Sequence, residues 1–369
     1  MKNRIVNFVK SQSVLVISFI AAVISMFFVP PDEKYVSYID RSVLILLFCL
    51  MSAVAGLRSI GFFKKAASYL LNKTKSVRNL GFILINLCFF SSMLITNDVA
   101  LITFVPLTIM LFEETNDKKS LIYTVITETV AANLGSMLTP IGNPQNLYIY
   151  SHYELSMGDF LEIMLPLGVI GYILLCGLTF ILSSERLNVN NNENVTVSKG
   201  YMIVYSLLFE VCLLTVLRII SYYVCLAVTL AVIFAANKRI FLEIDYMLLL
   251  TFVCFFVFVG NAGNIEAIRS LISSAVNGRE LIVSALLSQV LSNVPAAVML
   301  SGFTDNYADL LKGVDIGGLG TPIASLASLI SYKLYVKSRI ADSRKYMCCF
   351  LSINAVFLVL MIFAVMIWK

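Results

Sequence analysis

The stretch "SSMLITNDVALITFVP", from Ser91 to Pro106, decides how this chain folds. It is apolar at both ends, yet the polar residues Thr96, Asn97 and Asp98 stand in its middle. As one straight helix, the surrounding apolar region 80–112 would be about 50 Å long, which is too long for a single membrane crossing. We therefore predict a re-entrant hairpin over 80–112, which turns at these residues and leaves the membrane on the side where it entered.

The composition of the whole chain supports this membrane setting. Hydrophobic residues make up 59% of the 369 residues, charged residues make up 13%, and the mean hydropathy is +0.89. A soluble domain carries about 25% charged residues, so this chain has too few to cover a water-facing surface. Apolar runs such as 160–182 and 347–368 are long enough to cross a bilayer as helices. The sequence therefore predicts an all-α polytopic membrane protein embedded in the lipid bilayer.

The net charge of +5 does not indicate a nucleic-acid partner. The Lys and Arg residues lie mostly in short segments between apolar runs, where they indicate the cytoplasmic side of a membrane protein. Lys2, Arg4 and Lys10 predict a cytoplasmic N-terminus, and about nine crossings then predict an external C-terminus at the cytoplasmic membrane. The sequence has no nucleophile–histidine pair, metal cluster or cofactor motif, so we expect neither an enzyme nor a cofactor.

Two distant blocks of the sequence match weakly. "NLGSMLTPIGNPQNLYIY" (Asn133–Tyr150) aligns with "DIGGLGTPIASLASLISY" (Asp315–Tyr332). Upstream of each block, "LITNDVA" matches "LSNVPAA", which places Asn97 opposite Asn293. The first block makes an even number of crossings and one extra span separates the two blocks, so the second block is expected to run upside down. Inverted-topology repeats with interrupted helices are typical of secondary transporters.

The expected organisation has two repeats joined by a linker, and each repeat holds one re-entrant hairpin and one broken helix. Its boundaries are 1–182 for the first repeat, with a hairpin at 80–112 and a broken helix at 121–150; 183–200 for a polar cytoplasmic linker; and 201–369 for a linking span and the second repeat, with a hairpin at 280–303 and a broken helix at 313–336.

The breaks in these helices indicate ion binding. Where a helix is interrupted inside a membrane, its free carbonyl and N–H groups need partners. A cation can bind the carbonyls, and an anion can bind the N–H groups at a helix start. Pro144 suits the first turn of the short helix after the first break. The breaks contain no Lys or Arg, so an anion would be held by amides, hydroxyls and helix starts, with a bound cation offsetting its charge.

The candidate site residues belong to the two tips, the two breaks and one neighbouring span. The candidates for binding the substrate are Thr96, Asn97, Ser136, Asn143, Ser292, Asn293, Thr321 and Pro322. The candidates for binding a coupling cation or carrying a coupling proton are Asn97, Asp98, Glu128, Gly135, Asn293 and Gly317. Oxygen ligands without sulfur or imidazole suit Na⁺ at the hairpin tips.

Two of the acids have alternative interpretations. Asp98 is either an ion ligand or proton carrier, or the N-cap of the arm that starts at Val99. The cost of an acid in the middle of a membrane favours the functional role. Glu128 lies among three threonines of the span 121–138 and is either a proton relay or the partner of a hairpin hydroxyl.

At these residues the chain resembles the ion transporter superfamily, which includes divalent-anion/sodium symporters, citrate transporters, arsenite permeases and a sodium/proton antiporter branch. The symporters carry a Ser-Asn-Thr motif at each hairpin tip, and Thr96-Asn97-Asp98 and Ser292-Asn293-Val294 look like variants of it. "GSMLTPIGNPQN" (Gly135–Asn146) is similar to the broken-helix motif of the superfamily.

The resemblance implies that the tips and broken helices bind Na⁺ and substrate, that a transport domain slides against a scaffold in an elevator motion, and that the protein is a homodimer. Asp98 and Val294 stand where the symporters have a threonine that helps to hold a dicarboxylate. The leading hypothesis is a secondary active transporter of a small anion, a di- or tricarboxylate, coupled to Na⁺ or H⁺. The alternatives are a Na⁺/H⁺ antiporter and an arsenite or oxyanion efflux permease.

Overall fold

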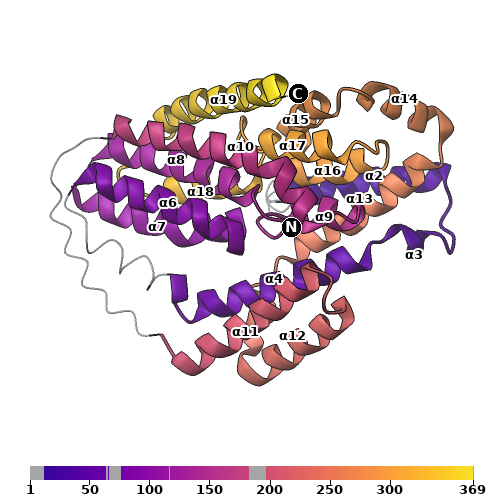
Figure 1. The fold of residues 1–369 in the computed structure, drawn as a ribbon, viewed down its shortest axis with the longest axis horizontal. Helices are drawn as coiled ribbons and strands as arrows, with labels where there is room; N and C mark the ends of the chain where they lie inside the picture. Colours follow the sequence, from indigo (N-terminus) through magenta and orange to yellow (C-terminus); the bar gives the residue numbers. More distant parts are fainter. Residues whose placement is uncertain (1–11, 64, 66–75, 116, 183–196, 369) are drawn as a thin grey trace, which may run out of the picture.

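The structure, a computed structural model, describes residues 12–63, 65, 76–115, 117–182 and 197–368, and its regular secondary structure is helical throughout (Figure 1). Of the expected linker 183–200, residues 183–196 lie outside the described residues. In chain order the helices are α2 (Ser13–Phe28), α3 (Tyr35–Tyr38), α4 (Arg41–Ser59), α6 (Val77–Ile95), α7 (Asn97–Thr115), α8 (Lys118–Ser136), α9 (Pro144–His152), α10 (Met157–Leu178), η1 (Thr179–Ile181), α11 (Lys199–Val216), α12 (Tyr222–Ala236), η2 (Lys238–Leu242), α13 (Tyr246–Gly263), α14 (Glu266–Val276), α15 (Glu280–Leu291), α16 (Asn293–Ser301), α17 (Tyr307–Gly317), α18 (Leu326–Tyr335) and α19 (Ser343–Trp368).

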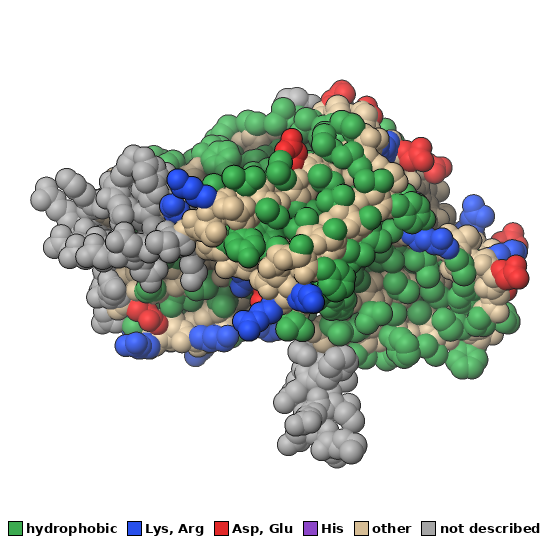
Figure 2. Space-filling model, turned by 90° about the horizontal axis from the view of Figure 1, so that it is seen from below, with side chains coloured by type: hydrophobic (Ala, Val, Ile, Leu, Met, Phe, Trp, Pro, Cys, Tyr) green, Lys and Arg blue, Asp and Glu red, His purple; other side chains and the backbone are tan. Residues whose placement is uncertain are grey.

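The surface of the molecule fits a lipid bilayer. Six of the described helices are long and apolar enough to cross one, namely α4, α6, α10 extended by η1, α11, α13 and α19. Large apolar side chains are exposed on α2, α6, α10, α11, α13 and α19, and hydrophobic side chains cover much of the described face in Figure 2. In water such a surface would be unfavourable. The predicted all-helical membrane architecture is therefore confirmed.

The helices form two interlocked sets and a separate layer. In the first set α6, α7 and α8 pack together, and in the second set α15, α16 and α17 do the same. The sets interlock because α18 packs against α7 and α8, while α9 packs against α16 and α17. Helices α4, α11 and α12 form the layer in the lower part of Figure 1, and α4 joins it to the rest through α9 and α13.

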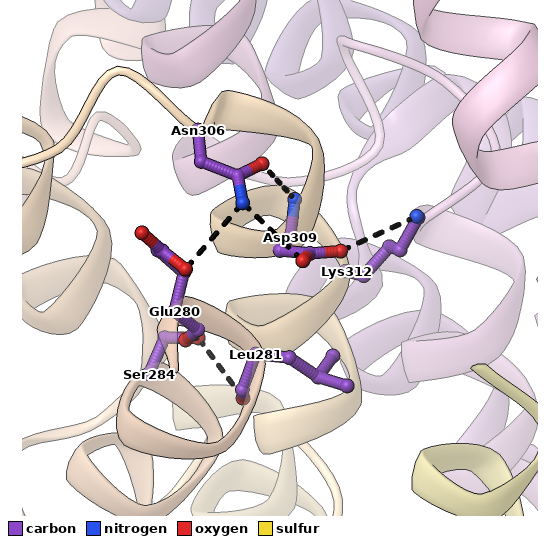
Figure 3. Close-up of polar contacts among 6 residues, drawn as sticks. All are labelled: Glu280, Leu281, Ser284, Asn306, Asp309 and Lys312. Carbon is purple, nitrogen blue, oxygen red and sulfur yellow. Dashed lines mark hydrogen bonds and ion pairs between the residues drawn. The ribbon is translucent and has the colours of Figure 1, made fainter. Parts of the chain in front are cut away.

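A polar cluster fastens α15 to α17 at the ends remote from their breaks (Figure 3). Glu280 is buried; its Oε1 accepts a hydrogen bond from Thr304 Oγ1 at 3.0 Å, and its Oε2 accepts one from Asn306 Nδ2 at 3.4 Å. The same Asn306 amide donates to Asp309 at 3.3 Å, and Lys312 pairs with Asp309 at 3.5 Å. These contacts connect the hairpin arm to the broken helix and leave the other ends of both helices for the site.

Candidate functional site

The two hairpin tips have the same backbone geometry. Thr96 ends α6 with φ 69° and ψ 150°, and Ser292 ends α15 with φ 79° and ψ 155°. Residues other than glycine rarely adopt this conformation, so the surrounding contacts must hold it. In the next residue of each tip, Asn97 N–H donates to the Gly142 carbonyl at 3.1 Å, and Asn293 N–H donates to the Ala324 carbonyl at 2.9 Å.

The tip asparagines also have equivalent side-chain contacts. Asn97 Oδ1 accepts a hydrogen bond from the Asp98 N–H at 2.9 Å, and Asn293 Oδ1 accepts one from the Val294 N–H at 3.0 Å. Each side chain thereby fixes the start of the helix that follows its tip. Asn97 makes one further contact, because its Nδ2 donates to Asn133 Oδ1 at 3.0 Å.

Two threonines bind the breaks to the hairpins. Thr139 Oγ1 donates to the Met93 carbonyl, and Thr321 Oγ1 donates to the Gln289 carbonyl at 3.1 Å. Met93 and Gln289 each lie four residues before a tip asparagine, so these hydrogen bonds occur at matching positions. The sequence match between the two blocks is therefore accompanied by matching contacts.

One glycine in each broken helix allows that helix to touch its hairpin arm. A Cβ at Gly135 would lie 2.0 Å from the Phe89 carbonyl oxygen, and one at Gly317 would lie 2.7 Å from the Ser288 side chain. Close approach therefore explains the residue type at both positions. The Gly317 carbonyl also accepts a hydrogen bond from Gln289 Nε2 at 2.8 Å.

Each break ends where a second short helix begins. After the first break, Asn143 is the N-cap of α9: its Oδ1 accepts from the Asn146 N–H at 2.9 Å. Pro144 occupies the first turn of α9, as the sequence predicts. After the second break, Ser325 precedes α18 and its hydroxyl donates to Asn133 Oδ1 at 3.0 Å.

The tips and the starts of the short helices surround one cavity of about 110 Å³. Asn97 and Asp98 come from the first tip, and residues 292–295 come from the second. Pro144 and Gln145 of α9 and Ser325 and Leu326 at the start of α18 complete this side of the wall. An adjoining cavity of about 160 Å³ shares Asp98, Pro144 and Asp245 with the first and extends to Thr96 and Asn143.

Four of the helices that begin at this cavity, α7, α9, α16 and α18, follow the tips and breaks, and α13 also begins there with its N-cap Asp245. Each helix start carries a partial positive charge and N–H groups without intrahelical partners. Two acids, Asp98 and Asp245, also line the cavity, and they are close enough for their negative charges to repel each other. None of its described lining residues is Lys or Arg. The adjoining cavity is also lined by Arg58, whose Nη1 forms an ion pair with Glu243 Oε2 at 3.9 Å.

The structure brings most of the predicted substrate residues to these cavities. Thr96, Asn97, Asn143, Ser292 and Asn293 line one or the other, as does the predicted cation residue Asp98. The remaining candidates lie outside the cavity walls, and these are Ser136, Thr321, Pro322, Glu128, Gly135 and Gly317. Ser136 holds the first break instead, because its hydroxyl donates to the Asn133 carbonyl at 3.0 Å.

Glu128 lies in the helix packing rather than at the cavity. Its side chain is fully buried in α8, and its Oε1 accepts a hydrogen bond from Thr108 Oγ1 of α7 at 2.6 Å. This contact is the hairpin hydroxyl considered as one alternative from the sequence. The Oε2 atom of Glu128 has no hydrogen-bond partner among the described residues.

A family model described as a citrate transporter matches residues 5–330. The chain belongs to the citrate transporter family. Its relatives include an uncharacterized transporter of Methanocaldococcus jannaschii, which is 36% identical over 298 residues covering 80% of this chain and 81% of that one. The inner membrane protein YbiR of Escherichia coli is 30% identical over 321 residues covering 85% of both chains. The silicon efflux transporter LSI3 of Oryza sativa is 32% identical over 151 residues, 39% of this chain and 30% of that one.

This citrate transporter family member is therefore a multi-pass membrane transporter. Sequence reasoning missed two acids of the family member's site. Asp245 is the N-cap of α13 and reaches the cavity only because α13 packs beside α16. Asp315 is buried behind Asn143 and Gln145 and accepts hydrogen bonds from both amides. The internal alignment carried a signal for Asp315, since it stands opposite Asn133.

Proposed function

We propose that this protein is a secondary active transporter that moves a small anion across the cytoplasmic membrane, coupled to Na⁺ or H⁺. The observation that carries the proposal is the convergence of four helix starts on one cavity. Together these starts attract negative charge without needing a Lys or Arg side chain. Binding sites in secondary transporters commonly lie where interrupted helices meet.

The anion would bind amides and hydroxyls. Asn97, Asn293 and Gln145 line the cavity with amide groups, and Ser292 and Ser325 add hydroxyls. These groups suit the oxygens of a carboxylate. A di- or tricarboxylate is the substrate class proposed first.

The coupling cation would offset the charge of this anion beside Asp98. A carboxylate next to a bound anion is unfavourable unless a cation or a proton neutralises it. The C-terminal ends of α6 and α15 add the negative ends of two helix dipoles at the tips. Na⁺ and H⁺ both fit this arrangement, and Asp98 is the residue at which either would act.

We further propose that the two matched halves are inverted repeats and that transport is an elevator motion within a homodimer. The equivalent tips and breaks support the repeat. The layer of α4, α11 and α12 would be the scaffold, because it is separate from the two interlocked sets. We also propose that the N-terminus is cytoplasmic and that the C-terminus is external.

The test is uptake into proteoliposomes that contain the purified protein. Labelled citrate, succinate and malate are supplied under an inward Na⁺ gradient, an inward proton gradient, or neither. We expect at least one anion to accumulate only when a cation gradient is imposed, and to show counterflow without one. If none of these anions shows counterflow, the carboxylate proposal is wrong.

A second candidate is efflux of a small hydroxylated solute such as arsenite or silicic acid. Asp98 and Asp245 favour it, because uncharged hydroxyl groups can donate hydrogen bonds to carboxylates that would repel an anion. One relative is named a silicon efflux transporter. The same proteoliposomes test this candidate with arsenite and silicic acid.

Exchange of Na⁺ for H⁺ in the absence of any solute would identify an antiporter instead, and Asp98→Asn should then abolish this exchange.

A further inference from the structure

Asp315 is an acid with one oxygen satisfied and the other not. It lies on α17 and is 3% exposed. Its Oδ1 accepts hydrogen bonds from Asn143 Nδ2 at 3.2 Å and from Gln145 Nε2 at 3.1 Å. Its Oδ2 is buried without a hydrogen-bond partner among the described residues, and the Asn146 side chain lies nearby. A charged oxygen in this position would lose its hydration without compensation.

The equivalent residue in the first half shows what Oδ2 lacks. Asp315 aligns with Asn133, and Asn143 aligns with Ser325. Asn133 Oδ1 accepts from Ser325 Oγ at 3.0 Å, just as Asp315 Oδ1 accepts from Asn143. The second side-chain atom of Asn133 is Nδ2, which donates to the Gly318 carbonyl at 3.4 Å. The second atom of Asp315 therefore occupies a position where its counterpart carries hydrogen.

We propose that Asp315 is a proton-carrying site, a carboxylic acid whose Oδ2–H takes the place of the amide N–H of Asn133. The proton is taken up from water at Oδ2 and returned to water from the same atom, and no other bond changes. The proposal names a proton as a coupling ion, and in that respect it rests on the proposed transport function. The protonation itself does not depend on that function.

The surroundings of Asp315 suit a proton better than Na⁺. The Asn143 and Gln145 groups that face the carboxyl are N–H groups, which repel a cation. A bound Na⁺ would instead need a shell of oxygens. The carbonyl of Gly317, two residues further along, accepts a hydrogen bond from Gln289 Nε2 at 2.8 Å.

No charged group among the described residues neutralises Asp315. Helix α17 packs against α8, α9, α10, α15, α16 and α19, and the interactions of Asp315 are with three amide side chains. The titratable groups of the packed helices have other partners or lie at helix ends; they include Glu128 with Thr108, Tyr148 with Ser301, Glu280 with Thr304, Tyr346 with Ser331, Asp309 with Lys312, and Glu162 near the start of α10. Helix α16 contains no titratable residue.

Asp315 is one hydrogen bond away from the cavity. Gln145 lines the cavity and Asn143 lines the adjoining one, and both donate to Asp315 Oδ1. Ionisation would put a negative charge behind these two amides. A bound anion and a neutral Asp315 therefore favour each other, and the coupling is reciprocal. Asp315 is a positioning residue for the substrate and does not touch it.

The test combines infrared spectroscopy with anion binding on the full chain. Protein grown with ¹³C-labelled aspartate is purified in detergent, and its spectrum is recorded at neutral pH. We expect the C=O stretch of a protonated aspartic acid, which shifts with the label and in D₂O. The band of Asp315 should remain in Asp98→Asn and should be absent in the double variant Asp98→Asn/Asp315→Asn. Asp315→Asn should stay folded, because asparagine supplies the hydrogen that the proton otherwise supplies.

Binding gives a second readout that a purely structural role would not move. In the wild type, the affinity for whichever of citrate, succinate or malate is bound should fall by about tenfold per pH unit above the titration. In Asp315→Asn the fall in affinity with pH should be shallower, because the contribution of Asp315 is lost and only that of Asp98 is left. The absence of a labelled band in Asp98→Asn, its survival in the double variant, or its removal from Asp98→Asn by Na⁺ at fixed pH would overturn the proposal. If Asp315→Asn does not fold, the labelled Asp98→Asn protein still decides whether a protonated aspartate remains.

The infrared result separates this proposal from the proposed function. A chain that transports none of the anions and still shows the band keeps the proton site and loses the symport. A chain that transports an anion without the band keeps the symport and loses the proton site. Asn133→Asp provides the matched control, because it should create a second labelled band at the equivalent position.

Discussion

The break between α8 and α9 and the break between α17 and α18 share their main contacts but differ at one buried side chain. Both tie a tip asparagine to a carbonyl of the break, and both use a threonine to hold a hairpin carbonyl. The first break has Asn133 behind it and the second has Asp315. Matched halves can therefore share a framework while only one of them carries an ionisable group. The predictions below test how far this equivalence extends.

The glycine pair should give the largest effect. Gly135→Ala drives a methyl group into the Phe89 backbone carbonyl, which cannot move aside without shifting α6. We expect a loss of about 3 kcal/mol in the free energy of unfolding, which is the upper part of the range for overpacked positions. Gly317→Ala meets the Cβ and hydroxyl of Ser288 at 2.7 Å and the Cα of Ala285 at 3.0 Å, which is a smaller overlap, and should cost about 2 kcal/mol. Chemical denaturation in detergent measures the free energy of unfolding of both variants. Equal losses would contradict the difference in packing at the two glycines.

The exchange of acid and amide should give the next effect. Asn133→Asp offers at most one O–H in place of the two N–H groups of Nδ2 that donate to Gly318 and Ser328, so one hydrogen bond is lost, and the variant should cost about 2 kcal/mol of stability. Asp315→Asn should change the stability by less than about 0.5 kcal/mol, because it reproduces the amide found in the first half. Thermal unfolding of the two variants in the same detergent checks this. A large loss in Asp315→Asn would contradict the equivalence.

Gln145 has no counterpart in the second half, where Ala327 occupies its position. Gln145→Ala removes one donor to Asp315 Oδ1 and should cost about 1 kcal/mol of stability. In the Asp315→Leu background the same substitution should cost nothing further, since the acceptor is gone. A double-mutant cycle measured by denaturation gives the coupling. Additive losses would show that the two residues do not interact.

The smallest effect should come from the hairpin tips. Thr96 and Ser292 both hold positive φ, which glycine adopts without strain. Thr96→Gly and Ser292→Gly should each change stability by less than about 1 kcal/mol, because relief of strain offsets the greater entropy of the unfolded chain. A stabilising change is expected to be larger at Thr96, whose β-branched side chain suits this conformation least. Paired melting curves check the order.

Local sequence signals predicted much of this architecture. The polar interruption at Thr96, Asn97 and Asp98 indicated a tip, and the repeated Thr-Pro-Ile motif indicated where its partner lies. Pro144 indicated a helix start. These features are encoded within a few residues, so a sequence pattern can find them.

The rest of the site depends on contacts between distant segments. Asp315 contacts Asn143 and Gln145, which lie 172 and 170 residues earlier in the chain. A contact between such distant segments cannot be read from a local pattern. Asp245 reaches the cavity through the packing of α13 on α16. Ser136, Thr321 and Pro322 were expected to bind substrate because they are polar or interrupt a helix, but their side chains lie outside the cavity walls. Polarity alone does not distinguish a group that holds a break from one that faces a ligand.

The most direct measurement of the central claim is a double-mutant cycle on the two tip asparagines. Asn97→Ala, Asn293→Ala and the double variant are compared with the wild type for counterflow of the transported solute in proteoliposomes. If both tips bind one solute, each single variant loses at least about tenfold in apparent affinity, and the double variant loses less than the product of the two. Wild-type affinity in either single variant, with the protein folded, would contradict a shared site.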